Sequence, residues 1–391
     1  MATSEAPSLP AKMRAYVHTR TGKPTDVLTL TELPLPPLPK PGSSDILVKI
    51  THATALFGDA FMMTIAPSLL RDKPCIPAIE FAGVVVAVDP QGTKTPPEPP
   101  LTVGTQVYGA VPLGRVFKRM PGAAAPSGAL AEYVLVPASR VVRRPENVSA
   151  EHAAGLGGAS SCTALALVKK AGLKRGQKVL VYGSSGSVGT LAVQIARTSV
   201  GDTGKVVAVC GPAGIQVAKD FGANEAAVPF KLYYTCAEQG NQVINRHEHG
   251  VIWEYLSERF KDEPFDAILD AYGLTEIFTH CEPYLEKGGI YVTVGTAFTS
   301  WTMWGAIASL LTTARLALLP SILGGTPRRF AAVVNDDDGP EAMEEIRSLA
   351  AAGKLRLYVD SVYDLEDVPE AYEKVMSRRV LGKIIVQVQV Q

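Results

Sequence analysis

Three glycines spaced three residues apart follow a short apolar run near the middle of the chain. Residues 179–182 have the length and composition of a buried parallel strand, and Gly183, Gly186 and Gly189 come directly after it. Residues 190–197 continue with apolar side chains on one face, as expected of a helix. A glycine loop between a strand and a helix aims backbone amides at the position of a pyrophosphate, so the run predicts a nucleotide site. Glycine also occurs in such turns for geometry alone, so the motif needs support from its surroundings.

Strands and helices alternate after this loop. A second apolar strand over 205–210 stands at the distance expected of a βαβ unit, and a helix over 215–221 ends at Gly222. Three further strands are expected at 226–228, 266–270 and 290–294. Alternation of this kind predicts an α/β fold, with a doubly wound parallel sheet covered by helices on both faces.

The regions on either side are richer in strands. In the first 150 residues, short strands are expected at 14–17, 28–32, 46–51, 81–88 and 131–136. After residue 328, the sequence predicts strands at 330–334, 355–362 and 383–388, with helices at 341–352 and 368–377. We therefore expect a β-rich domain over 1–150, a nucleotide-binding domain over 151–328, and a return of residues 329–391 to the first domain.

The charge and cysteine content exclude several classes of function. The 391 residues include 38 basic and 38 acidic side chains, which gives no electrostatic basis for binding nucleic acid or an anionic membrane surface. Five scattered cysteines, an odd number, indicate a reducing compartment and no disulfide framework. Residues 1–12 lack the pattern of a signal or transit peptide. We expect a cytoplasmic protein.

Two segments admit more than one interpretation. Residues 301–325 are nearly all apolar and long enough to span a bilayer, but Arg315 and Pro320 favour one or two buried or interface-facing helices. The long connection 229–264 contains one cysteine and two histidines at irregular spacing, with no fourth ligand near them. This pattern favours surface residues over a metal site.

Several runs together resemble one known superfamily. The matching runs are 76–85, 103–109, 128–134, 179–196, 221–223, 265–270 and 381–385, within a resemblance that extends from about residue 13 to residue 388. The chain is similar to medium-chain dehydrogenases/reductases, in particular to their zinc-free quinone oxidoreductase branch and to enoyl reductases of fungal secondary metabolism. The resemblance implies a GroES-like catalytic domain, a Rossmann-type NADP-binding domain and an oxidoreductase activity.

Zinc-dependent members of the superfamily carry cysteine and histidine ligands that this chain lacks. Leu56 stands where the first catalytic cysteine would align, Ala78-Ile79-Glu80 replaces a Gly-His-Glu run, and no cysteine lies between Cys75 and Cys162. The resemblance therefore implies no metal site, because one cysteine alone cannot build a tetrahedral centre. Without zinc to polarise an alcohol, the expected chemistry is hydride delivery to an already electrophilic carbon.

The resemblance also implies where a nicotinamide cofactor binds. The pyrophosphate would lie on the glycine loop, the adenosine ribose at the next strand end, the nicotinamide ring at a later strand end, and a basic side chain nearby. In that order the residues are Ser185, Gly186, Ser187, Val188 and Gly189, then Cys210 and Gly211, then Val294, Gly295 and Thr296, then Lys383. A solvated lysine is an equal alternative for the last of these. NADPH is expected over NADH, because residues 210–214 hold no acid that would repel a ribose phosphate.

The catalytic residues implied by the resemblance are fewer. Thr163 is expected to touch the nicotinamide or a phosphate, although Thr163 and Thr296 can equally serve as cap or strand-end hydroxyls. Asp59 is retained from the pattern of the branch, while Phe61 stands where a tyrosine would be. With that phenol absent, we expect the protein chiefly to orient substrate against cofactor, and a proton to come from water or a ribose hydroxyl.

An apolar substrate pocket is expected from four further side chains, some of which can instead be core. These are Phe57, Tyr108, Phe298 and Met303. They favour a small apolar electrophile as substrate. The resemblance implies NADPH-dependent reduction of an enone, an enoyl group or a quinone, and homodimers are common in the branch. The sequence leaves open a nucleotide-binding module with little turnover, or a non-redox catalyst acting on a biosynthetic intermediate.

Overall fold

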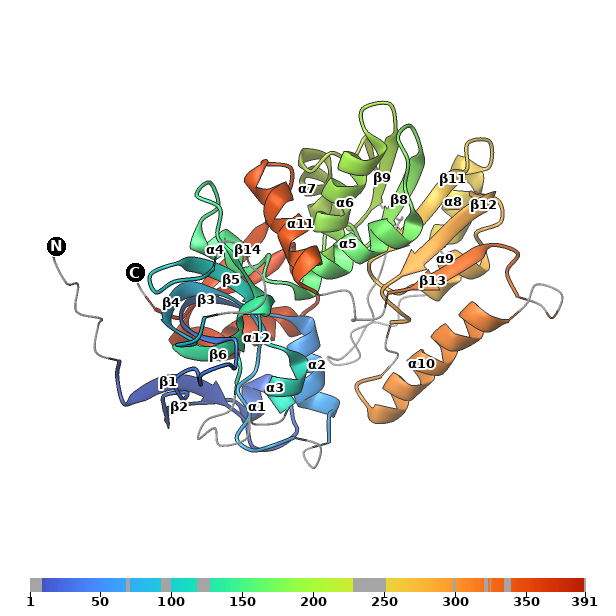
Figure 1. Ribbon diagram of the computed structural model, residues 1–391. Coiled ribbons are helices and arrows are strands. Elements are labelled where there is room, and N and C mark those ends of the chain that lie inside the picture. The colour runs from blue at the N-terminus through green and yellow to red at the C-terminus, as the bar shows by residue number, and fades with distance from the viewer. Residues whose placement is uncertain are drawn as a thin grey trace. The chain divides into compact units, whose positions relative to one another are not determined.

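The computed structural model divides into two compact units, which are described separately (Figure 1). The first unit comprises Met1–Ala159, Gly339–Ser348 and Val359–Gln391, and the second comprises Ser160–Asp338 and Leu349–Tyr358. The structure describes residues 9–67, 71–92, 100–117, 127–227, 251–297, 300–319, 323, 325–333 and 339–389.

The second unit is built on a six-stranded parallel sheet in the order β10-β9-β8-β11-β12-β13. The strands are β8 (Lys178–Tyr182), β9 (Lys205–Val209), β10 (Glu225–Ala227), β11 (Phe265–Asp270), β12 (Leu285–Thr293) and β13 (Arg329–Ala332). The chain starts at the central β8, builds outward to β10, and then crosses to β11 on the other side. This reversal is the topological switch point at which doubly wound sheets bind ligands. The α/β fold class is confirmed.

Helices lead into and connect these parallel strands. They are α5 (Ala159–Ala171), α6 (Ser187–Val200), α7 (Ile215–Asp220), α8 (Ile252–Phe260), α9 (Thr275–Thr279) and α10 (Met303–Leu318). One face of the sheet packs on α8 and α9, where Leu180 and Tyr182 join Leu256, Phe260 and Phe278 in a buried cluster. Because strand side chains alternate, the remaining β8 residues face the opposite side, against which α6 packs.

The last strand of this sheet differs from expectation. Residues from 329 onward were expected to rejoin the first domain, but Phe330 pairs with Tyr291 and Ala332 with Thr293, in parallel. The physical reason is aromatic packing, because the ring of Phe330 stacks on Tyr291 at 5.8 Å and meets Phe278 at 4.9 Å between centroids. That assignment was wrong for β13, which extends the nucleotide-domain sheet.

The first unit is β-rich. A two-stranded ribbon joins β1 (Lys12–Val17) to β2 (Thr29–Pro34), and a larger sheet has the order β14-β15-β3-β4-β5-β7, with β6 paired to β3. Its strands are β3 (Asp45–Ala55), β4 (Glu80–Val88), β5 (Gln106–Ala110), β6 (Tyr133–Pro137), β7 (Val141–Arg143), β14 (Val359–Asp364) and β15 (Lys383–Gln387). Its helices are α1 (Pro24–Val27), α2 (Phe57–Ile65), α3 (Leu113–Phe117), α4 (Ala150–Ala154), α11 (Pro340–Ala351) and α12 (Val368–Met376). The carboxyl-terminal β15 pairs with the long β3, so distant parts of the chain complete one sheet.

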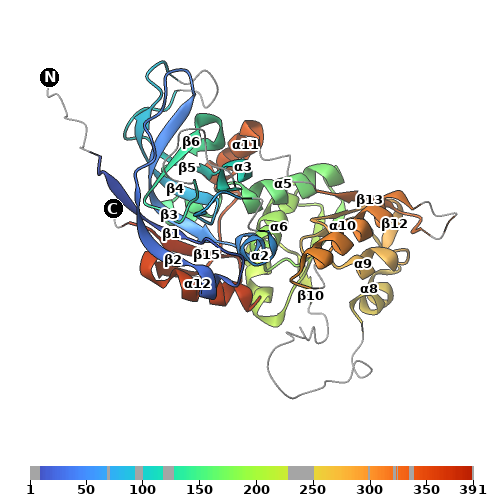
Figure 2. The same cartoon turned by 90° about the horizontal axis from the view of Figure 1, so that it is seen from below.

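Within the apolar segment 301–325, Met303–Leu318 form α10, which packs beside β13 (Figure 2). Only Gly305 and Ser309 of this helix are buried. The expectation of a buried helix was therefore wrong, and the interface-facing alternative stays a prediction. Among the described residues, no helix has both the length and the apolar character needed to cross a membrane.

Candidate functional site

The glycine loop after β8 has the geometry of an anion cradle. Gly183 has φ of +73°, which favours glycine, and Gly186 is the N-cap of α6. A Cβ built on Gly189 would lie 2.1 Å from the carbonyl oxygen of Gly183, so only glycine permits this approach of helix to strand. Ser185 and Ser187 are half-buried, and the first amides of α6 have no carbonyl of their own helix to bind. The loop can therefore hold a phosphate.

The end of β9 lies next to this loop, because β8 and β9 pair in parallel. Cys210 is buried, and burial raises the pKa of its thiol. The thiol therefore stays protonated, and Cys210 is suited to line a site and not to act as a nucleophile. Gly211 is exposed, with open space around a Cβ built on it. The side chain of Ser184 donates to the carbonyl of Val209 at 3.1 Å and ties the two strand ends together.

Asp270, at the end of β11, organises the neighbouring strand ends. Its carboxylate accepts hydrogen bonds from the backbone amides of Tyr272 and Gly273, at 2.9 and 2.8 Å, and from the hydroxyls of Tyr291 and Thr293. The side chain is fully buried, and burial raises its pKa while the Tyr291 hydrogen bond lowers it. Four donors on one buried carboxyl fix the turn after β11. The sequence analysis assigned Asp270 no role, although an acid ending a strand three residues before Gly273 was a usable signal.

The nicotinamide-flanking residues expected at 294–296 follow β12. The amide of Val294 donates to the carbonyl of Asp270 at 3.0 Å, and Gly295 has φ of +107°. The amide of Thr296 donates to Oγ1 of Thr313 at 3.1 Å, and the two hydroxyl oxygens are 2.7 Å apart. This is the strand-end hydroxyl role noted as the alternative for Thr296, and its contact with a cofactor stays a prediction.

The structure brings most of the expected cofactor residues to one edge of the second unit. Residues 185–189, 210–211 and 294–296 follow β8, β9 and β12, and the carboxyl ends of parallel strands share an edge. Thr163 lies on α5 and is half-buried, Met303 begins α10, and Phe298 lies outside the described residues.

The other expected residues lie in the first unit, where the half-buried Asp59 lies beside the buried polar side chains of Glu80, Tyr372 and Lys383. Asp59 is at the third position of α2 and accepts from the amide of Leu56 at 3.1 Å. Burial first, and the charge of Glu80 second, raise the pKa of the Asp59 carboxyl to about 7. The buried Tyr372 of α12 interacts electrostatically with the same carboxyl, and burial raises the pKa of its phenol. Asp59 therefore changes charge near neutral pH.

Lys383 is fully enclosed and pairs with Glu80, which is also fully buried. The Oγ1 atom of Thr54 donates to the same Glu80 oxygen as Lys383, at 3.0 Å. The Lys383 ammonium is thus ion-paired with a carboxylate, that of Glu80, within its own unit. The solvated alternative for Lys383 is wrong, and its contact with a cofactor stays a prediction.

The expected pocket residues of the first unit have different surroundings. Phe57 and Phe61, one helical turn apart on α2, have ring centroids 6.3 Å apart, and the guanidinium of Arg378 lies 4.9 Å from the Phe57 centroid. Tyr108 on β5 is completely enclosed. Phe57 is half-buried, while Phe61 and Tyr108 have the burial of core residues. Their contact with a substrate stays a prediction.

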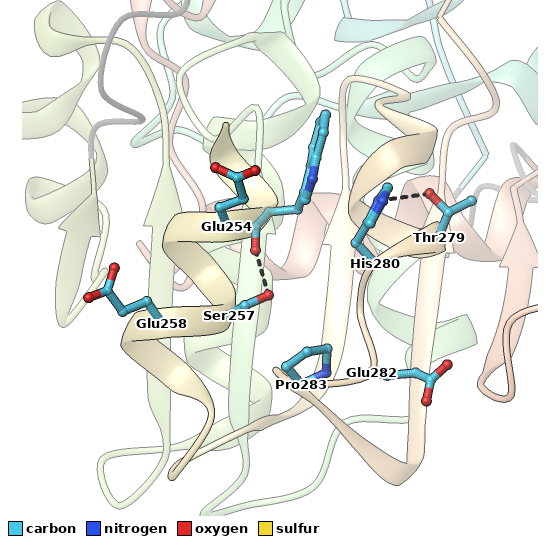
Figure 3. Close-up of a pocket in the computed structure, with 8 residues that line it drawn as sticks. Glu254, Ser257, Glu258, Thr279, His280, Glu282 and Pro283 are labelled. Carbon is cyan, nitrogen blue, oxygen red and sulfur yellow. Dashed lines mark hydrogen bonds between the residues drawn. The ribbon is translucent and has the colours of Figure 1, made fainter. Parts of the chain in front are cut away.

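A shallow depression of about 720 Å³ lies elsewhere on the second unit, between α8 and the end of α9 (Figure 3). Glu254, Glu258 and Glu282 line it, together with His280, whose ring stacks on Trp253 at 4.9 Å. A smaller pocket of about 200 Å³ lies between α9 and α10. Residues of the glycine loop, of 210–211 and of 294–296 line neither pocket. Neither pocket is therefore the expected cofactor site.

The donor set does not suit zinc. Within the described residues, no three histidine, cysteine, aspartate or glutamate side chains come together as metal ligands. In the 78–80 run, Glu80 is the sole side chain with a donor atom, and it is already paired with Lys383. A tetrahedral centre needs three or four such donors.

Comparisons with known proteins match both units. Residues 42–146 match the family model of the alcohol dehydrogenase GroES-like domain, and residues 239–386 match that of the zinc-binding dehydrogenase. The chain is 30% identical to trans-enoyl reductase poxH of Penicillium oxalicum, over 96% of this chain and 98% of the relative. It is 29% identical to medium chain reductase pydE of an Acremonium species, over 96% and 99% of the two chains. Among solved structures, the quinone oxidoreductase of Coxiella burnetii superposes with a TM-score of 0.72, at 21% identity, over 97% of this chain and 100% of that one.

Proposed function

Because the chain belongs to the medium-chain dehydrogenase/reductase superfamily, in its quinone and enoyl reductase branch, we propose that it is an NADPH-dependent, zinc-independent reductase of an activated C=C bond or a quinone. The family makes the protein an oxidoreductase with a nicotinamide cofactor. The observation that carries the finer proposal is the Gly183–Gly189 cradle, together with three other strand ends at the switch point of the sheet.

The residues of the second unit fit a dinucleotide. The half-buried loop over 185–189 would hold the pyrophosphate on the first amides of α6, and Gly211 leaves room for an adenosine ribose. No acid stands in 210–214 to accept from ribose hydroxyls, which favours the 2′-phosphate of NADPH. When bound, the nicotinamide supplies a hydride, and the protein supplies binding and orientation.

In the part of the chain that the structure describes, no three metal-ligating side chains come together, and Glu80 is already paired with Lys383, which supports a reaction that needs no metal. Alcohol oxidation in this superfamily needs a Lewis acid, whereas an enone, an enoyl thioester or a quinone is already electrophilic. Relatives named trans-enoyl reductase and medium chain reductase support substrates of this type.

The first unit would contribute orientation and a proton reservoir. The half-buried ring of Phe57, which lies 6.3 Å from that of the buried Phe61, offers an aromatic surface suited to an apolar ligand. Asp59, with a pKa near 7, holds its proton part of the time at neutral pH and can donate a hydrogen bond from the same helix. A cytoplasmic location stays a prediction that rests on the cysteine content. Homodimer formation stays a prediction that rests on the resemblance.

The test is stoichiometric consumption of reduced cofactor by the purified full chain. An enoyl thioester, a cyclic enone and a benzoquinone are offered with NADPH or NADH, and a saturated aldehyde serves as the control. We expect NADPH oxidation with at least one activated substrate and none with the aldehyde, with kcat/KM at least about tenfold higher for NADPH than for NADH. Metal analysis should find no stoichiometric zinc, and a chelator should leave the rate unchanged.

Three results would contradict the proposal. They are cofactor binding without turnover on any activated substrate, a clear preference for NADH, and loss of activity on chelation that zinc restores. The first of these would instead favour a nucleotide-binding module or a non-redox catalyst.

A further inference from the structure

The hydroxyl of Tyr372 is enclosed in the first unit without a hydrogen-bond partner. Tyr372 lies on α12, its side chain has no exposed surface, and its Oη atom makes no hydrogen bond with any described residue. A buried hydroxyl in a folded protein nearly always has a partner, because leaving it unpaired destabilises the fold. An exception of this kind calls for a reason in the structure or the function of its surroundings.

The charged group that acts on this phenol is the carboxyl of Asp59. Helix α12 packs against α2, which carries Asp59 at its third position (Figure 1 and Figure 2). Burial is the largest influence on the pKa of both groups, and in addition each group acts on the other. The Tyr372 phenol lowers the pKa of the Asp59 carboxyl, and the charge of Asp59 raises the pKa of the phenol.

One oxygen of Asp59 remains available for such a neighbour. Oδ2 accepts from the amide of Leu56 at 3.1 Å, which fixes the start of α2, while Oδ1 accepts no hydrogen bond from a described residue. A phenol suits this position, because its hydroxyl can donate to a carboxylate and can accept from a carboxylic acid. Tyr372 can therefore serve Asp59 in both protonation states.

The other charges around Asp59 are already paired with each other. Glu80 of β4 and Lys383 of β15 form a buried ion pair, and Oγ1 of Thr54 donates to Glu80. After burial, which raises the pKa of Asp59 most, Glu80 raises it further and Lys383 lowers it. Because this pair is committed, Tyr372 is the neighbour that can change its hydrogen bond when Asp59 changes charge.

We propose that Tyr372 is a positioning residue for Asp59, whose carboxyl it holds in one orientation while Asp59 takes up and releases a proton. The proposal rests on the proposed reductase activity, because reduction of an activated C=C bond or a quinone consumes a proton as well as a hydride. The Asp59 O–H bond breaks, and its proton goes to the carbon beside the one that receives the hydride, or to a quinone oxygen. The carboxylate that remains accepts from Tyr372 and regains a proton from water. The enclosed Tyr372 acts only through Asp59.

The first test measures the pKa of Asp59 without substrate or cofactor. The wild type, Tyr372→Phe, Asp59→Asn and the double variant are unfolded in urea from about pH 4 to 9. Comparison with Asp59→Asn should show that Asp59 lowers the free energy of unfolding as pH rises, and that this fall ends near pH 7. With Tyr372→Phe the end of the fall should move up by about 0.5–1 pH unit, because the carboxylate loses a hydrogen-bond donor.

Tyr16→Phe is the matched control. Tyr16 is also a buried tyrosine of the first unit, and its hydroxyl donates to the carbonyl of Glu366 at 3.0 Å. Both substitutions keep the ring and remove one hydroxyl, so both proteins should fold. The control should leave the end of the fall near pH 7, and a Tyr372→Phe protein that does the same would overturn the proposal.

The second test is the pH profile of kcat with an activated substrate that the wild type reduces. Asp59 must hold its proton in order to donate it, so kcat should decrease as pH rises above about 7. Tyr372→Phe should move this decrease up by the same amount as in the unfolding data. It should also lower kcat about tenfold at about pH 6 while KM changes less than about twofold, because positioning acts on the chemical step. Asp59→Asn should abolish the decrease, and Tyr16→Phe should match the wild type.

The outcomes separate this proposal from the proposed function. An active Tyr372→Phe enzyme whose kcat and pH profile match the wild type would overturn the positioning role and leave the reductase activity standing. A chain that reduces none of the activated substrates would refute the proposed function, and with it the part of Tyr372 in proton delivery. The unfolding data would still decide whether the Tyr372 hydroxyl binds Asp59.

Discussion

Alanine substitution of two glycines in the nucleotide loop should separate packing from cofactor binding. At Gly189 a Cβ would lie 2.1 Å from the carbonyl oxygen of Gly183 and 2.7 Å from Cα of Ser184, both backbone atoms that cannot rotate away. At Gly186 the nearest heavy atom to a new Cβ is 3.7 Å away, and φ of −81° suits alanine. Gly189→Ala must therefore displace α6 from the loop, while Gly186→Ala leaves the protein itself unstrained.

The size of each effect follows from these distances. An ordinary contact begins at 3.4 Å, so alanine at 189 pushes the start of α6 away by about 1.3 Å, an overpacking that costs about 1–3 kcal/mol in the free energy of unfolding. A shift of this size in the amides that hold the pyrophosphate should lower kcat/KM for NADPH about 100-fold. Gly186→Ala should change the free energy of unfolding by less than about 0.5 kcal/mol. It should still weaken NADPH binding about tenfold or more, because its methyl group enters the space of the phosphate.

Urea unfolding and fluorescence titration with NADPH measure the two quantities on the same samples. Gly288→Ala is the control, because a Cβ there meets nothing within 4 Å and the residue lies outside the loop. A Gly189→Ala protein with wild-type stability would refute the steric argument. A Gly186→Ala protein that binds NADPH normally would show that the phosphate does not lie on this loop.

Three further predictions concern buried ionisable groups. The pKa of Asp59 is raised to about 7 in the folded protein, so between about pH 4 and 7 the folded protein holds a proton that the unfolded chain has lost. The free energy of unfolding therefore falls as pH rises through this range. Asp59→Asn should remove about 1–2 kcal/mol of that fall in urea titrations at several pH values, a modest amount because the half-buried side chain is partly screened by solvent. The pH dependence due to His18 has the opposite sign. Burial lowers the pKa of this imidazole to about 4, so the free energy of unfolding falls as pH drops from about 6.5 to 4. His18→Gln should reduce this loss of stability in acid in the same titrations. Lys383→Met should lower the free energy of unfolding in urea by about 3–5 kcal/mol, because it leaves Glu80 charged and buried without a partner. The double variant Lys383→Met/Glu80→Gln should recover part of that loss. Equal losses in the single and double variants would contradict the ion-pair argument.

The sequence predicted the parts of the fold that depend on local pattern. The strand over 179–182 appears as β8 (Lys178–Tyr182), and the alternation after it correctly predicted a parallel sheet. The assignment of β13 was wrong because a four-residue strand carries no local mark of the sheet that it joins. Its place is decided by the contact of Phe330 with Tyr291, 39 positions apart, which no periodicity reveals.

The candidate site was predictable to a similar limit. The glycine loop and the strand ends follow from spacing, because the fold brings the carboxyl ends of parallel strands together. The cluster of Asp59, Glu80, Tyr372 and Lys383 is assembled from α2, β4, α12 and β15, which are up to 324 positions apart in the chain. A sequence identifies such residues one at a time, and it cannot show that one of them shifts the pKa of another.

Helix α10 shows why composition alone could not decide which side of an apolar segment faces inward. Its large residues would favour burial, yet the hydrogen bonds that Ser309 and Thr313 make with Thr296 turn the polar side toward the sheet. An unpaired backbone carbonyl inside the protein costs about 1–3 kcal/mol, which is comparable to the gain of about 1.5–3 kcal/mol from burying one leucine, so these hydrogen bonds can offset that burial. With the polar side of the helix bound to the loop after β12, its large apolar side chains Trp304, Leu310 and Leu311 stay exposed. The same hydrogen bonds hold the loop that we propose to flank the nicotinamide, so the orientation of the helix follows from three residues 13 to 17 positions apart that no local pattern connects.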